Sequence, residues 1–162
     1  MPVKKTMLLG LAALSLAFAS PAIADATVQV KLWDKGGVAG MSKNMGMGMG
    51  MGADMMKAVM GVELDQISVP AGKVTFTVVN ASKEAVHEAI FAPVASTDVV
   101  LPYNAATHRV DEEAAGSLGE VADLEAGKSG TLTLNLKPGF YAVYCNIEGH
   151  FMAGMWTVLE VK

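Results

Sequence analysis

Short runs of alternating apolar and polar residues, separated by turn signals, are the feature that most constrains the fold of this 162-residue chain. In the first run, Ala26–Trp33, apolar residues occupy every second position from Val28 to Leu32, and Gly36-Gly37 follows shortly after. Side chains point alternately to the two faces of a β-strand, so this pattern predicts a strand with one buried face.

Seven further runs of this kind lie between residues 62 and 161. They are Val62–Val69, Val74–Asn80, His87–Ala92, Leu118–Leu124, Thr131–Leu136, Phe140–Cys145 and Met155–Val161. Turns such as Lys137-Pro138-Gly139 separate them. Short strands at this spacing predict an all-β fold, a Greek-key β-sandwich of seven to eight strands. Residues 93–117 interrupt the rhythm and predict a long loop, with room for one helical turn at the acidic residues 111–113.

Residues 1–24 have the features of a secretory signal peptide. Lys4 and Lys5 precede an apolar run from Met7 to Ala19, and residues 22–24 (Ala-Ile-Ala) form a small-residue cleavage site. The apolar run is shorter than the roughly 20 residues that span a bilayer, which disfavours the alternative of a membrane anchor. We therefore expect residues 25–162 to form a single periplasmic domain that is not stably inserted in the membrane.

Methionine is the anomaly of the composition, because eight of the 12 methionines lie between Met41 and Met60. The surrounding segment 36–61 also contains eight glycines, which predicts a flexible, low-complexity segment. Thioethers are soft, uncharged ligands that suit Cu(I). Two interpretations of the segment stay open. It is either a tract that captures Cu(I) or a glycine-rich linker whose methionines bind nothing.

The single cysteine, Cys145, limits the chemistry of the chain. One cysteine excludes an internal disulfide framework, and a net charge of −4 lacks the basic footprint that nucleic-acid binding requires. A free thiol in an oxidising compartment also needs protection. Burial, an intermolecular disulfide or a metal bond would each protect Cys145, and only a metal bond also explains the histidines and methionine described next.

Four residues carry the side chains of a type 1 copper site: His87, Cys145, His150 and Met155. In such sites two imidazoles and a thiolate form a trigonal plane, and a thioether binds weakly on the axis. Four residues separate Cys145 from His150, and four separate His150 from Met155, in a segment between two predicted strands. Each residue alone more often has a structural role, but their order in a secreted sandwich predicts one copper site. His108 lacks such neighbours and is predicted to be solvated surface.

This pattern resembles the cupredoxin family, the plastocyanin and azurin relatives, over roughly residues 62–162. The resemblance rests on Val79-Asn80, His87 and the segment from Tyr144 to Met155, and the C-x4-H-x4-M spacing is most similar to rusticyanin- and auracyanin-type domains. It implies that His87, Cys145, His150 and Met155 are the copper ligands. One position departs from the pattern. Where plastocyanin and azurin commonly have an asparagine that braces the cysteine loop, this chain has Glu88, and Asn146 is a candidate to take over part of that role.

Two functions follow from these features. The first is a one-electron carrier that uses Cu(I)/Cu(II) and docks a redox partner protein. The apolar residues around His150, which are Ile147, Phe151, Met152 and Ala153, either form that docking site or close the core. The alternative is a copper homeostasis or tolerance protein that binds, buffers or delivers copper to a copper-handling partner. An enzyme is the weakest interpretation and is not expected. Cys145 has no adjacent histidine to reach a second copper centre, and three histidines leave no ligands for a further cluster.

Overall fold

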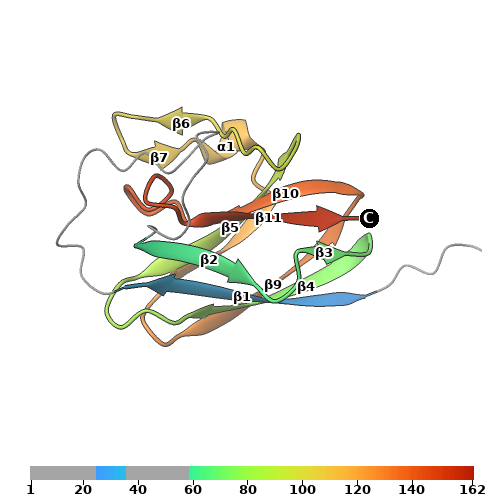
Figure 1. The fold of residues 1–162 in the computed structure, drawn as a ribbon, viewed down its shortest axis with the longest axis horizontal. Helices are drawn as coiled ribbons and strands as arrows, with labels where there is room; N and C mark the ends of the chain where they lie inside the picture. The colour runs from blue at the N-terminus through green and yellow to red at the C-terminus, as the bar shows by residue number, and fades with distance from the viewer. Residues whose placement is uncertain (1–24, 36–58) are drawn as a thin grey trace, which may run out of the picture.

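The computed structural model describes residues 25–35 and 59–162, and within these residues the protein is a sandwich of two β-sheets (Figure 1). Sheet A has the strand order β2-β1-β4-β9, sheet B has the order β3-β11-β10-β5-β8, and β6 and β7 form a small separate ribbon. The strands are β1 (Ala26–Asp34), β2 (Met60–Leu64), β3 (Ser68–Val69), β4 (Gly72–Asn80), β5 (His87–Val94), β6 (Tyr103–Asn104), β7 (Arg109–Val110), β8 (Gly119–Leu124), β9 (Ser129–Leu136), β10 (Gly139–Tyr144) and β11 (Trp156–Val161). The predicted all-β Greek-key sandwich is confirmed.

Sheet A follows the alternation that the sequence predicts. The even-numbered residues of β1 and β4 from Val28 to Leu32 and from Val74 to Val78 are buried in the core between the sheets. The two strands run parallel, with Val28 opposite Phe76 and Val30 opposite Val78. Burial of these side chains is the main source of stability in such a sandwich.

The run Val62–Val69, predicted as one strand, is two strands in different sheets. β2 pairs with β1 in sheet A, whereas β3 pairs with β11 in sheet B. Between them, the Asp65 carboxylate accepts a hydrogen bond from the Gln29 backbone amide, and the Gln66 side chain donates to the Thr27 carbonyl oxygen. These contacts fix the point at which the chain leaves sheet A.

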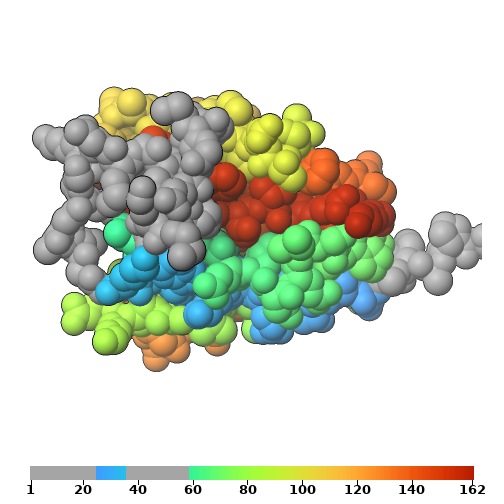
Figure 2. All heavy atoms as spheres, in the orientation of Figure 1, coloured from blue at the N-terminus to red at the C-terminus, as the bar shows by residue number. Residues whose placement is uncertain are grey.

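The central strands of sheet B, β5 and β10, are buried on both faces. Ala89 and Phe91 of β5 face the core between the sheets, while Ile90 and Ala92 face a second apolar cluster on the outer side. Residues 95–118 supply much of this cluster and form the yellow cap above the red and orange strands in Figure 2. Residues 95–118 of the predicted long loop therefore cover the outer face of sheet B, and they are called the cover below.

The cover contains the helical turn for which the sequence has room. Helix α1 (Glu112–Ala115) begins at Asp111, whose carboxylate accepts a hydrogen bond from the Ala114 amide, and ends at Gly116 with φ of 69°. An aspartate cap followed by a left-handed glycine stabilises both ends of a short helix.

The predicted flexible segment 36–61 is partly corrected by the structure. Met60 and Gly61 lie in β2, and Met60 is buried in the core. The Trp33 indole lies so close to Gly61 that an added Cβ would stand 2.7 Å from a ring carbon, so this position requires glycine. The predicted signal peptide and residues 36–58 lie outside the described residues. In the part of the chain that is described, no helix has the length and apolarity to cross a membrane.

Candidate metal centre

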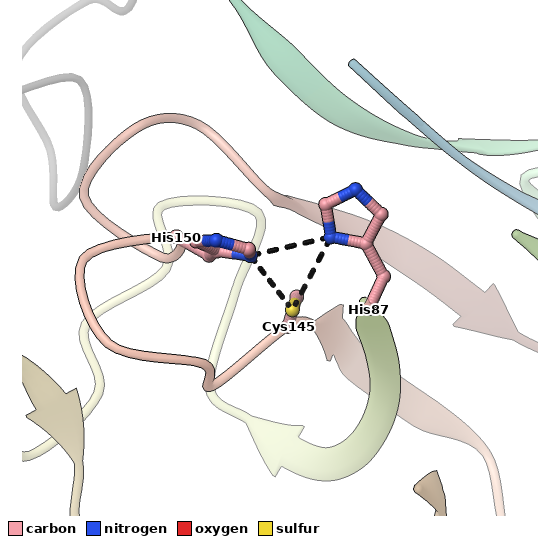
Figure 3. A group of neighbouring side chains, drawn as sticks. All are labelled: His87, Cys145 and His150. Atoms are coloured by element: carbon pink, nitrogen blue, oxygen red, sulfur yellow. Dashed lines mark hydrogen bonds between the residues drawn. The ribbon is translucent and has the colours of Figure 1, made fainter. Parts of the chain in front are cut away.

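His87, Cys145 and His150 converge at one end of the sandwich. Their side chains point toward one another, as Figure 3 shows. His87 is the first residue of β5, Cys145 directly follows β10, and His150 lies in the loop between β10 and β11. The Nδ1 atoms of the two histidines are 3.2 Å apart, and Cys145 Sγ lies 3.4 Å from Nδ1 of His150 and 4.0 Å from Nδ1 of His87. All three side chains are buried.

These separations fit a single metal ion bound in a trigonal plane. In such a plane, metal bonds of about 2.0 Å to nitrogen and about 2.3 Å to sulfur place two nitrogens about 3.5 Å apart and a sulfur about 3.7 Å from each nitrogen. The observed separations of 3.2, 3.4 and 4.0 Å lie around these values. Two imidazoles and a thiolate are also the equatorial donor set of a type 1 copper site.

Burial governs the protonation of the three side chains. It raises the pKa of the Cys145 thiol to about 12 and lowers the pKa of His150 to about 4, with the neighbouring His87 lowering it further. Burial also lowers the pKa of His87. At neutral pH the metal-free site therefore holds a neutral thiol and two neutral imidazoles, and a cation that replaces the thiol proton supplies the charge that stabilises the thiolate.

Met155 lies at the base of the same loop. Its backbone oxygen accepts a hydrogen bond from the Cys145 amide at 3.0 Å, and its amide donates to the His150 oxygen at 3.1 Å. The side chain is completely buried in the core. The backbone of Met155 is thus bonded to two of the three clustered residues, while its role as fourth ligand stays a prediction.

The loop that carries His150 is a compact turn. The His150 amide donates to the Ile147 oxygen and the Gly154 amide donates to the Phe151 oxygen. Gly149 and Gly154 have φ of 80° and 104°, in the region that favours glycine. Glycine at these two positions lets eleven residues from Cys145 to Met155 turn back on themselves.

The cover over sheet B holds this loop from outside. The Asn146 side chain accepts a hydrogen bond from the Val110 amide at 2.6 Å and donates to the Val110 oxygen at 2.9 Å. It also donates to the Glu112 carboxylate, and the Arg109 guanidinium donates to the Asn146 carbonyl oxygen. His108 is exposed, as predicted, but its carbonyl oxygen accepts from the Gly149 amide.

Glu88 itself braces the cysteine loop. One of its carboxylate oxygens accepts a hydrogen bond from the Asn146 amide at 3.0 Å, next to Cys145. Burial raises the pKa of Glu88, and that hydrogen bond opposes the rise. The position that departs from the familiar asparagine is therefore still connected to the residue after the cysteine, and the Asn146 side chain contributes by bonding to the cover.

Asn80 orders the turn between β4 and β5, which leads to His87. Its amide group donates to the oxygens of Ala85 and Leu124, and its oxygen accepts from the amide and hydroxyl of Ser82. A fully buried asparagine with every contact satisfied fixes the turn that leads into β5.

Asp34 is the site residue that sequence reasoning missed. Its carboxylate lies 3.4 Å from Nε2 of His87, the ring nitrogen that faces away from Cys145 and His150. The available signal was the alternation of β1, because Asp34 is in phase with the buried residues Val30 and Leu32.

The docking surface predicted around His150 is not formed by the four apolar residues. Phe151 is fully buried in the outer cluster, with its ring centre 6.0 Å from that of Tyr103 and 5.9 Å from that of Tyr144. Ala153 is also buried, and only Ile147 and Met152 are partly exposed. These side chains mostly close the core.

Comparison with known proteins identifies the family of the chain. The family model for copper-binding proteins of the plastocyanin/azurin family matches residues 47–162. The chain belongs to this family. The family and the His87, Cys145 and His150 group of this cupredoxin together support one type 1 copper.

The solved structure of rusticyanin shows the same fold. Rusticyanin from Thiobacillus ferrooxidans has a TM-score of 0.52 and 20% identity to this cupredoxin, over 84% of this chain and 77% of that one. Auracyanin from Roseiflexus castenholzii has a TM-score of 0.47 and 16% identity, over 85% and 96% of the two chains. No curated protein sequence matches the chain.

Proposed function

We propose that this cupredoxin is a periplasmic one-electron carrier whose copper is held by His87, Cys145, His150 and Met155. Members of the family are typically electron carriers rather than enzymes. The observation that supports the ligand assignment is the convergence of three buried donor atoms at metal-binding separations. Bound copper supplies the one-electron couple Cu(I)/Cu(II).

The surroundings of the donors support a carrier. Glu88 and Asn146 connect the cysteine loop to β5 and to the cover, and Asn80 orders the turn before His87. Donors that the fold holds in position move little when the charge of the metal changes. A small structural change on oxidation and reduction favours rapid electron transfer.

The test of this function is the colour and the redox behaviour of the copper-loaded protein. We expect a strong thiolate-to-Cu(II) absorption band and a reversible one-electron wave in voltammetry. Cys145→Ser is expected to abolish the band, and His87→Ala to weaken or abolish it. His108→Ala is the matched control, because His108 is exposed and outside the cluster, and it is expected to keep the full band. Full colour in Cys145→Ser would contradict the assignment.

The periplasmic location and a redox partner protein belong to the same proposal. The location is supported by the signal-peptide features of residues 1–24. Isolation of the protein from the periplasmic fraction with residue 25 at its amino terminus is the expected result. A cytoplasmic protein that retains residues 1–24 would contradict it.

A second candidate function is copper homeostasis, and one structural observation favours it. Lys35 and Val59, which flank residues 36–58, are joined by a backbone hydrogen bond of 2.8 Å. The residue before Lys35 is Asp34, which contacts His87. Both attachment points of the methionine-rich segment are therefore at the end of the sandwich that carries the metal-binding cluster.

The two candidates differ in how much Cu(I) the protein binds. A variant with residues 41–58 replaced by glycine and serine loses seven methionines but keeps Met60, which is buried in β2. With the type 1 site filled, loss of bound Cu(I) or Ag(I) in this variant at unchanged colour would favour homeostasis. Equal stoichiometry in the two proteins would favour the carrier alone.

A further inference from the structure

The carboxylate of Asp34 lies on the otherwise apolar inner face of strand β1. The buried side chains of β1 are Val28, Val30 and Leu32, and Asp34 continues the same phase at the end of the strand. Its side chain is 11% exposed. A carboxylate removed from water is costly unless it is paired or hydrogen-bonded, so its contacts at this position have a structural or functional role.

The contact with His87 joins sheet A to the metal-binding cluster of sheet B. Nδ1 of His87 faces Cys145 and His150, and Nε2 lies 3.4 Å from the Asp34 carboxylate. When Nδ1 binds a metal, the proton of the neutral imidazole is on Nε2, which can then donate to Asp34. A carboxylate behind a ligating histidine fixes the ring orientation and increases its electron donation.

The backbone of Asp34 is held in place. It is paired with Met60 in the antiparallel register of β1 and β2, and the next residue, Lys35, donates its amide hydrogen to the Val59 oxygen. Asp34 is therefore positioned by sheet A independently of the loop that carries Cys145 and His150. The carboxylate provides a fixed negative charge beside one ligand.

We propose that Asp34 is a positioning residue that orients the His87 ring and stabilises the oxidised form of the copper site. This inference rests on the proposed function. A negative charge stabilises Cu(II) more than Cu(I) because the oxidised ion has the larger positive charge. Asp34 therefore lowers the reduction potential of the site.

The decisive variant is Asp34→Asn, which keeps an oxygen acceptor for His87 and removes the charge. We expect the ratio of Cu(II) to Cu(I) affinity to fall at least tenfold, which corresponds to a rise of about 59 mV in the potential of a one-electron couple. Asp34→Ala also removes the acceptor and is expected to change the electron paramagnetic resonance and absorption spectra as well, because the ring is no longer held.

Asp98→Asn is the matched control. Asp98 is exposed and lies in the loop after Val94, whereas His87 is at the opposite end of β5. It is expected to leave the potential unchanged. Urea unfolding of the metal-free proteins separates a general loss of stability from an effect on the site.

The outcomes distinguish this inference from the proposed function. A wild-type protein without the thiolate-to-copper band would overturn both. A coloured wild type with an equal or lower potential in Asp34→Asn would overturn the role of Asp34 and leave the carrier function standing. An equal rise in Asp98→Asn would also overturn it, because the effect would then be one of net charge. If Asp34→Ala does not fold, the Asp34→Asn measurement still decides.

Discussion

The two sheets differ in how their outer faces are covered, and the metal-binding cluster belongs to the sheet that is covered on both sides. On the outer face of sheet A, Val79 is 38% exposed, and the hydroxyls of Thr75 and Thr133 form an exposed cross-strand hydrogen bond. On the outer face of sheet B, Ile90 and Ala92 are fully buried beneath residues 95–118.

This difference indicates how the site is held. His87 begins a strand of sheet B, and the loop with Cys145 and His150 connects two other strands of that sheet. The loop is bonded to Glu88 on β5 and to Val110 in the cover. Sheet A contributes a polar contact to the cluster, that of Asp34 with His87.

The largest expected effect tests the covered face directly. Ile90→Ala leaves a cavity in the outer cluster of sheet B and is expected to lower the free energy of unfolding by about 2–5 kcal/mol. Val79→Ala on the outer face of sheet A is the control, with an expected loss of no more than about 1 kcal/mol. Urea unfolding of the metal-free proteins measures both. Similar losses would show that the two outer faces do not differ energetically.

The next effect tests the attachment of the loop to the cover. Asn146→Ala removes the side-chain hydrogen bonds from the loop to Val110 and Glu112. It is expected to lower copper affinity by about 10- to 100-fold, because the ligands on the loop are then held less firmly. Asn135→Ala, on the exposed side of β9, is the matched control and is expected to leave the affinity unchanged. Affinity is measured by competition with a chelator. Unchanged affinity in Asn146→Ala would show that the cover is not needed to hold the ligands.

The burial of the cluster in sheet B also predicts a pH dependence. The pKa of Cys145 is raised to about 12, so the metal-free thiol is protonated at neutral pH and copper must displace that proton. The pKa of His150 is lowered to about 4, so this imidazole is already neutral and releases none. Copper affinity is therefore expected to rise about tenfold for each unit of pH around neutrality.

Calorimetry in buffers of different ionisation enthalpy counts the released protons, and one proton per copper is the expected value. Release of two or more protons would show that a histidine is charged in the metal-free protein. No release would show that the thiolate exists before copper binds.

The smallest effect concerns Met155. Met155→Leu is expected to change copper affinity by less than about tenfold and to raise the potential, because an axial thioether binds weakly while the equatorial ligands supply most of the affinity. Met152→Leu, in the same loop but partly exposed, is the control and is expected to keep the wild-type potential. Complete copper loss, or a lower potential in Met155→Leu, would contradict the axial role.

The sequence predicted most of the strands because alternation is a local property. Val28, Val30 and Leu32 mark the buried face of β1 without knowledge of its neighbours. It did not show that Val62–Val69 divides between two sheets, because that depends on which strands lie beside each half. The alternation does change phase within this run, because the buried valine before the break is at an even position, Val62, and the buried valine after it is at an odd position, Val69.

The set of candidate ligands was also visible in the sequence, because residue type and the two four-residue spacings carry that information. The convergence of His87 with Cys145 and His150 required the tertiary structure, since a strand and a loop 58 residues apart meet only when β5 and β10 pair in sheet B. The same holds for the contact of Asp34 with His87, for Glu88 as the brace, and for the burial of Phe151 beneath the cover. Side-chain chemistry and local periodicity are properties of the sequence, whereas the partners of a buried polar or aromatic group are chosen by long-range packing.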